Sequence, residues 1–200
     1  MTFLTTPFLP FLSLSLLLLL ANPVSTCTPP SDPPTPTFTA PFSVQVQNTS
    51  YPQINNRFLN FWQAGGGDQH LYLSPAGTPV ANITLDNGVM QRLPDGALQK
   101  LVIRAVINGE YTASDNTTKM FLTNRGDPRA LFDAGWGCNG TDDSLQRELV
   151  FRGRGTLPGG HICVRLASGN RWEFRYSPPG NTAFGGLCIK VKLALIPTTP

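Results

Sequence analysis

Turn-forming residues recur at short intervals along this chain, and they limit the length of any regular element. Glycine and proline each occur 19 times among 200 residues. The turn signals are GGGD (65–68), SPAG (74–77), DNG (86–88), PDG (94–96), NGE (108–110), GRG (153–155), PGG (158–160), SGN (168–170) and SPPGN (177–181). No Gly- and Pro-free window of helical length shows a convincing helical repeat of apolar residues. The spacing of the turns therefore predicts an all-β fold.

The segments between the turns alternate between apolar and polar residues, as half-buried strands do. In FSVQVQ (42–47), Phe42, Val44 and Val46 fall on one face. The other expected strands are VANITL (80–85), ALQKLVIRAVI (97–107), TKMFLT (118–123), ELVF (148–151) and CIKVKLALI (188–196). Residues 42–196 hold all of them and have the length of a single compact domain, followed by a short tail at 197–200.

Two architectures fit many short strands with close turns: a β-sandwich and a trefoil-like small barrel. ITLDNGVM (83–90) and LVFRGRGTL (149–157) share a strand, a glycine turn and a following apolar residue. A trefoil repeats its unit three times, whereas two convincing copies are present here. Both architectures therefore stay open.

The first 26 residues resemble a secretory signal peptide. Phe11–Ala21 is an unbroken run of Phe, Leu, Ser and Ala between Pro10 and Pro23. As a helix it would span roughly 16 Å against roughly 30 Å of bilayer hydrocarbon, so it is too short to cross a membrane. We expect cleavage before Cys27, secretion of the mature chain and no membrane span after signal removal.

Residues 27–41 are expected to form a disordered stalk. The sequence TPPSDPPTPTFTAP (28–41) is mostly Pro, Thr and Ser, which favours polyproline II and cannot build a core. The C-terminal VKLALIPTTP lacks the hydrophobic tail that a lipid-anchor signal requires. The formal net charge is +3 with no run of Lys or Arg, so we expect no nucleic-acid partner.

The stretch HICVRLASGNRWEFRY (161–176) predicts a hairpin that turns at residues 168–170. The face expected to point inward carries Ile162, Val164, Leu166, Trp172, Phe174 and Tyr176. The opposite, charged face carries His161, Cys163, Arg165, Arg171, Glu173 and Arg175. In the last strand, Cys188 has the outward parity of Lys190 and Lys192.

The four cysteines are expected to form two disulfides in an oxidising compartment. Cys163 and Cys188 share a side on two late strands, which favours their pairing and leaves Cys27 with Cys138. Three connectivities are open from sequence alone. A free catalytic thiolate at Cys163 is not expected in a secreted protein.

Four Asn-X-Ser/Thr acceptors predict N-glycosylation of the secreted chain. They are Asn48, Asn82, Asn116 and Asn139. Neither a metal nor a cofactor is expected: His70 and Asp68 are the best local pair of metal ligands, and a metal site needs three or four.

No hydrolase signature occurs in the chain, so no catalytic residue is assigned. A glycoside hydrolase would need a carboxylate pair, for which the obvious acids are Asp133, Asp142, Asp143, Glu148 and Glu173. Aromatic side chains offer another chemistry, because a flat ring stacks on the apolar face of a sugar. The candidate glycan contacts are Trp136, in a Gly-rich acidic loop, and Trp62 with Tyr72 beside the AGGGD loop.

The signal peptide, the Pro/Thr stalk, I-C-V (162–164) and C-I-K-V-K-L (188–193) together resemble uncharacterised secreted β-domain proteins of filamentous fungi, over roughly residues 40–196. The resemblance implies an extracellular, cysteine-bridged β domain that often lies beside Ser/Thr-rich regions, and it transfers no catalytic residue. This chain departs from it by lacking a C-terminal Ser/Thr-rich region, which favours release over wall attachment.

The leading hypothesis is a secreted, non-catalytic β domain that binds cell-wall or other extracellular polysaccharide. Two other classes stay open: a secreted hydrolase that uses loop carboxylates, and an effector that binds a host protein. The sequence does not predict an oligomeric state.

Overall fold

Strands and turns account for all regular structure in the part of the chain that the computed structural model describes, residues 27–92, 102–182 and 187–198. The strands are β1 (Phe38–Gln47), β2 (Arg57–Gly65), β3 (Asp68–Leu73), β4 (Thr78–Pro79), β5 (Ile83–Asp86), β6 (Val89–Arg92), β7 (Ile103–Thr112), β8 (Thr117–Thr123), β9 (Ala130–Cys138), β10 (Leu145–Arg154), β11 (Leu157–Pro158), β12 (His161–Ala167), β13 (Arg171–Ser177), β14 (Cys188–Lys190) and β15 (Lys192–Pro197). The all-β prediction is confirmed. The predicted signal peptide lies outside the described residues.

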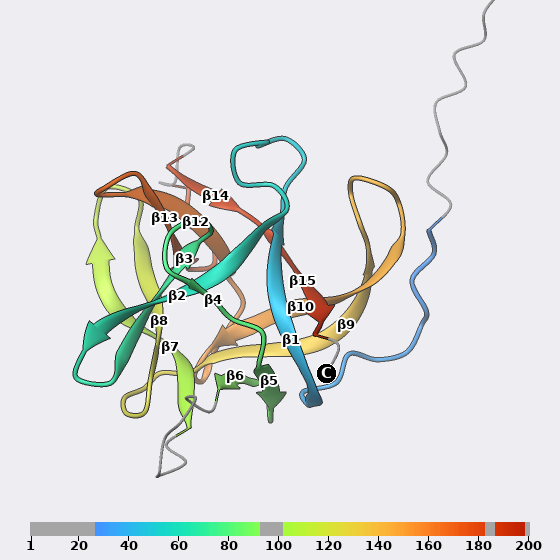
Figure 1. The fold of residues 1–200 in the computed structure, drawn as a ribbon, viewed down its shortest axis with the longest axis horizontal. Coiled ribbons are helices and arrows are strands. Elements are labelled where there is room, and N and C mark those ends of the chain that lie inside the picture. The colour runs from blue at the N-terminus through green and yellow to red at the C-terminus, as the bar shows by residue number, and fades with distance from the viewer. Residues whose placement is uncertain (1–26, 93–101, 183–186, 199–200) are drawn as a thin grey trace, which may run out of the picture.

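Antiparallel pairing closes the sheet into a barrel of 10 strands (Figure 1). The pairs lead from β1 through β2, β3, β13, β8, β7, β6, β9, β10 and β15 back to β1. β12 and β14 extend the sheet from β13, and β5 bridges β1 and β6. Closure pairs most of the edges that an open sheet would expose.

The expected choice between a β-sandwich and a trefoil-like barrel was wrong, because the closed barrel is neither of them. Closure depends on pairs between distant segments, such as Phe42 with Pro197 of β15. Alternation along a single strand looks the same in all three architectures, so local sequence does not reveal it.

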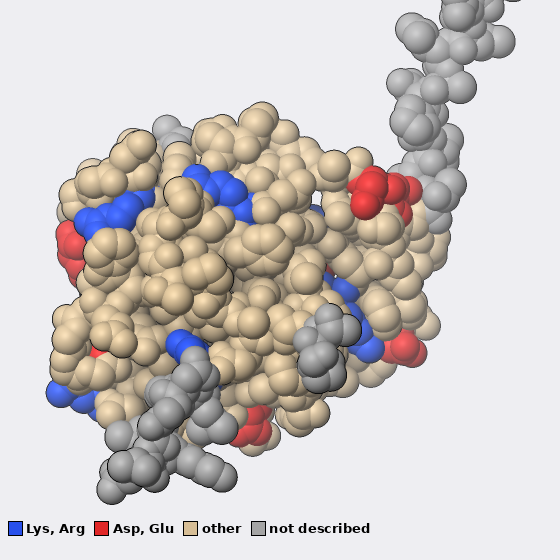
Figure 2. Space-filling view, viewed as in Figure 1, with Lys and Arg blue, Asp and Glu red and all other residues tan. Residues whose placement is uncertain are grey.

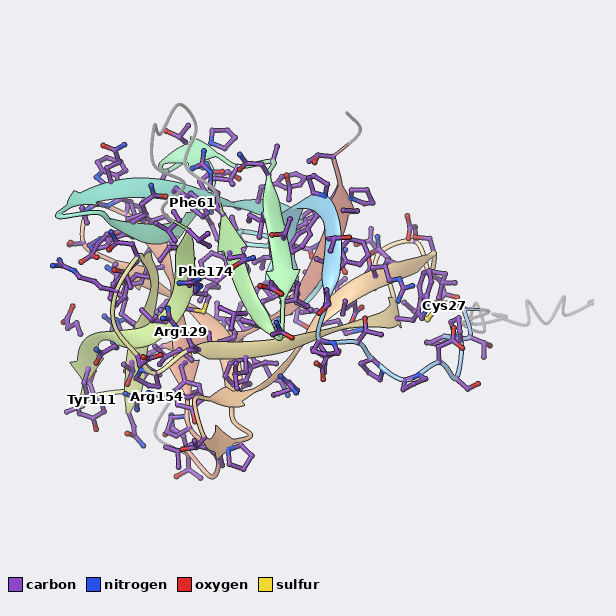
Figure 3. The ribbon with its side chains drawn as sticks, turned by 90° about the horizontal axis from the view of Figure 1, so that it is seen from below. Cys27, Phe61, Tyr111, Arg129, Arg154 and Phe174 are labelled. Atoms are coloured by element: carbon purple, nitrogen blue, oxygen red, sulfur yellow. A yellow bond between two sulfur atoms is a disulfide. The ribbon has the colours of Figure 1, made fainter. Side chains whose placement is uncertain are left out.

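The apolar faces of the strands fill the barrel with side chains. Phe42, Val44 and Val46 are fully buried, as the alternation of β1 predicts. The core continues through Phe61 of β2 and Phe174 of β13, which lie in the body of the molecule, whereas Cys27 lies beyond one end of it (Figure 3). Apolar side chains from the described strands therefore fill the interior of the barrel.

The segment expected as a stalk is in part attached to the barrel. β1 starts at Phe38, which pairs with Leu85 of β5. Upstream, Thr35 exchanges two main-chain hydrogen bonds with Ala134 of β9. Regular pairing thus begins before residue 42, because partner strands supply hydrogen-bonding edges that the sequence of this segment does not reveal.

Both disulfides have the predicted connectivity, Cys27–Cys138 and Cys163–Cys188. The predicted hairpin is β12–β13, with Val164 opposite Phe174 in the core. None of the described residues belongs to a helix of the length and apolarity needed to cross a bilayer.

Candidate functional site

Trp62 is the aromatic side chain of the three predicted glycan contacts that solvent reaches best. It is 45% exposed, on the outer face of β2 next to the core residue Phe61. The β2–β3 hairpin places it opposite His70 of β3. Because Phe61 faces the core, alternation turns the indole of Trp62 outward.

Tyr72 and Arg171 both lie against this indole. The Trp62 and Tyr72 rings are nearly perpendicular, with centroids 6.3 Å apart. The guanidinium carbon of Arg171 lies 5.1 Å from the centroid of each ring. Tyr72 is itself buried at 5% exposure, so it positions Trp62 and offers little surface to a ligand. The structure thus brings the predicted pair together and adds Arg171 from β13.

Two hollows share a wall formed by Trp62, Pro75 and Ala76. One, of about 680 Å³, extends over residues that include Gln63, Gln69, Thr78 and Arg92. The other, of about 440 Å³, extends over Arg57, Gly169, Asn170 and Arg171. Both volumes fall in the range that small ligands occupy. Polar donors and an exposed indole therefore line one continuous region of the surface.

A buried network of charges lies under this surface. Glu173 of β13 accepts from Lys119 at 2.8 Å, Arg175 at 2.5 Å and Arg165 at 3.2 Å. Arg165 also pairs with Asp115 at 3.2 Å. The hairpin places Arg165, Glu173 and Arg175 on its charged face, as predicted, but Arg175 is 0% and Glu173 3% exposed.

The main chain and side chains of residues 110–117 cover Arg175. Its guanidinium donates to the Glu110 carbonyl at 2.8 Å and to the hydroxyls of Thr112 and Thr117 at 2.7 and 2.6 Å. The expectation that the charged face is simply the outer, solvated one was wrong. Residues 110–117, which are distant in sequence, cover this face. The alternation of residues along the hairpin does not reveal that contact.

Opposing effects set the pKa of Glu173. Burial raises the pKa, but hydrogen bonds and charge from Lys119 and Arg175 outweigh it, and the net pKa lies below the ordinary value. The pKa of His70 is lowered, first by burial and then by Lys119. The His70 Nδ1 atom lies 3.4 Å from both the Lys119 Nζ and the Tyr72 hydroxyl, so the network continues to the aromatic group.

Trp136, the other predicted sugar contact, has a different environment. It is half-buried in β9, and the guanidinium of Arg147 stacks on its ring at 3.7 Å from the centroid. Arg147 lies directly opposite Trp136 on β10. This cation is therefore stacked closely on one face of the Trp136 ring, whereas Arg171 lies farther from the Trp62 ring, at 5.1 Å, and Trp62 is the more exposed of the two. Trp172 packs against the core, as predicted.

The acids that a hydrolase would use have separate structural partners. Asp133 pairs with Arg152 at 3.3 Å, and Glu148 accepts from Gln146 at 2.9 Å. Asp142 accepts from Ser144 within its own turn, and Asp143 accepts from the main-chain N–H of Cys27. Glu173 is the centre of the buried network. No carboxylate among the described residues lines either hollow beside Trp62.

The remaining predicted sites stay predictions. All four sequon asparagines, Asn48, Asn82, Asn116 and Asn139, keep part of their surface in solvent. Asp68 accepts from Thr123 at 2.7 Å and lies 3.8 Å from Arg125. Among the described residues, the group of metal-type ligands that converges is Cys27, Cys138 and Asp143, and its two sulfurs are joined in a disulfide.

Fold and surface together define a class: a disulfide-bonded, closed antiparallel β-barrel domain with a packed interior and an exposed tryptophan between two surface hollows. The chain belongs to the DUF7909 family, a domain of unknown function, whose model matches residues 28–198. Neither the search of curated proteins nor that of solved structures gave a significant match.

Proposed function

We propose that this domain is a non-catalytic, extracellular module that binds carbohydrate through the surface around Trp62. The observation that carries the proposal is the exposed indole, which contacts Tyr72 and Arg171 and is flanked by two hollows. A rigid aromatic plane offers the apolar side of a sugar ring a large contact area at low entropic cost.

Polar groups around the indole suit the hydroxyls of a sugar. Gln63, Gln69 and Asn170 line the hollows and provide both donors and acceptors. Such a combination of one aromatic plane with a few fixed polar groups is typical of small-molecule sites. The two disulfides fit an extracellular setting, which is where a polysaccharide partner would be met.

Retention on insoluble polysaccharides tests this function. The purified chain from Cys27 onward is applied to chitin, β-glucan, mannan and immobilised polygalacturonate, next to its Trp62→Ala and Trp136→Ala variants. We expect retention of the wild-type protein on at least one of them and a loss of about tenfold or more in affinity for Trp62→Ala, equivalent to about 1.4 kcal/mol. Trp136→Ala is the matched control and should bind as the wild type does.

Two results would reject the proposal. One is the absence of retention on all four polysaccharides. The other is equal binding by the wild type and Trp62→Ala. Thermal unfolding of each variant, recorded in parallel, separates lost binding from lost folding.

A further inference from the structure

Two arginines flank Trp62 in the smaller hollow. Arg57 begins β2, and Arg171 begins β13 directly after the turn that contains Gly169 and Asn170. Both turn residues have positive φ, 69° and 56°, which is the backbone of a tight hairpin turn. This turn carries Arg171 to the edge of the indole, and its Nε donates to the Ser168 carbonyl at 3.1 Å.

Neutral groups hold both guanidinium groups. Arg57 donates to the main-chain carbonyls of Ser74, Gln53 and Leu73. Among the described residues, neither Arg57 nor Arg171 is within ion-pair distance of a carboxylate. Burial lowers the pKa of Arg57, which remains a cation at neutral pH. Each arginine therefore keeps its full charge without a counter-ion from the described chain.

The charged residues in the described wall of the smaller hollow have one sign. This hollow is lined by Arg57 and Arg171, and its described wall contains no Asp or Glu. Figure 2 looks onto β2 and β4, and the acidic side chains visible on this face lie mainly near its edges. A concave region whose charged lining residues are all cations attracts anions, and a low-dielectric wall such as the indole strengthens that attraction.

We infer that the ligand is an acidic saccharide, one that carries a carboxylate or a sulfate. The sugar ring stacks on Trp62, and its anionic group lies between Arg57 and Arg171. The planar guanidinium fork matches the geometry of such oxyanions in a way that a lysine ammonium does not. The inference rests on the proposed function and specifies the chemical class of its ligand.

Paired probes test the charge of the ligand. Binding is measured calorimetrically for oligogalacturonate and its methyl ester, which is neutral, and for dextran sulfate and neutral dextran. We expect at least one anionic probe to bind about tenfold or more tightly than its neutral counterpart. The two pairs distinguish a carboxylate from a sulfate. Because exposed charges are screened, the preference should weaken between low and high salt.

Three variants separate the site from the general positive charge of the protein. Arg171→Gln should lose most of the preference for the anionic probe, and Trp62→Ala should lose binding to it. Arg147→Gln removes one positive charge beside Trp136, away from the hollow, and should keep the preference. If the melting curve shows that Arg171→Gln is unfolded, Arg57→Gln is measured in its place and should also lose preference for the anionic probe.

The inference is overturned if charged and neutral probes bind equally, or if Arg171→Gln and Arg147→Gln behave alike while both are folded. In these cases Trp62-dependent binding of neutral sugars would still support the proposed function. Full binding of an anionic probe by Trp62→Ala would also overturn the inference, because it would show adsorption to basic groups elsewhere.

Discussion

The role of a single residue in this protein depends on which other residues bury it. Glu173 lies on the face of the β12–β13 hairpin that its sequence marks as polar, yet it is 3% exposed and contacts three cations. A buried ion pair contributes little net stability compared with an apolar replacement, but removal of one partner leaves the others uncompensated. Glu173 is therefore a sensitive position in the layer that supports the Trp62 surface.

Glu173→Gln is expected to destabilise the protein strongly. Loss of the carboxylate leaves Lys119 and Arg175 buried without their counter-ion, which costs about 3–5 kcal/mol. Urea denaturation followed by tryptophan fluorescence measures the change. Glu110→Gln, on an exposed side chain, is the matched control and should stay within about 0.5 kcal/mol of the wild type. Equal stability of the two variants would contradict this role of Glu173.

The same residue makes stability sensitive to acid. Its folded pKa lies below its ordinary value of 4.5, so the folded state binds fewer protons than the unfolded state in that range. The contribution of Glu173 is complete above pH 4.5 and is lost as the pH falls through the folded pKa. Denaturation curves between about pH 7 and pH 3 should show this loss in the wild type and a smaller one in Glu173→Gln.

Among the elements, the turn before β12 constrains the hairpin that carries Glu173, Arg175 and Arg171. Gly159 and Gly160 both have positive φ and join β11 to β12. A Cβ on Gly160 would lie 2.5 Å from the Ser177 carbonyl oxygen and 2.6 Å from Tyr176 Cε2. This glycine therefore supplies both a left-handed backbone and a close approach of β12 to β13.

Gly160→Ala is expected to cost roughly 1–2 kcal/mol for the left-handed backbone and a further 1–3 kcal/mol for the steric overlap. Gly180→Ala is the control, since Gly180 has a φ of 70° and a Cβ added there would meet no atom within 4 Å. It should show the backbone cost alone. Chemical denaturation of both variants gives the comparison, and equal losses would argue against the close approach.

Local sequence predicted the elements of this fold better than their environment. Alternation correctly placed Phe42 and Phe174 in the core. The Cys163–Cys188 disulfide was predicted because the two cysteines fall on the same side of their strands and cysteines pair in an oxidising compartment. The exposure of a side chain, in contrast, depends on which distant strands pair. Arg147 covers Trp136 only because the β9–β10 register sets them opposite each other, and Arg171 reaches Trp62 only because β13 lies beside β3.

At the scale of the whole molecule, barrel closure determines which surface residues become neighbours. It brings β2, β3 and β13 side by side, although Trp62 and Arg171 are more than a hundred residues apart in sequence. Such long-range neighbours follow from the pairing of distant strands. For this reason the sequence indicated the aromatic residues of the site but neither its arginines nor its hollows.

The central claim is that carbohydrate binds at Trp62, and the indole signals of the three tryptophans test it directly. In a two-dimensional ¹⁵N–¹H spectrum, each tryptophan side chain gives one N–H signal, which Trp→Phe variants assign. The protein is titrated with oligogalacturonate and, separately, with a neutral β-glucan oligomer. We predict that at least one titrant shifts the Trp62 signal and leaves those of Trp136 and Trp172 in place. A stationary Trp62 signal with both titrants, or a shift of Trp136 in its stead, would contradict the account.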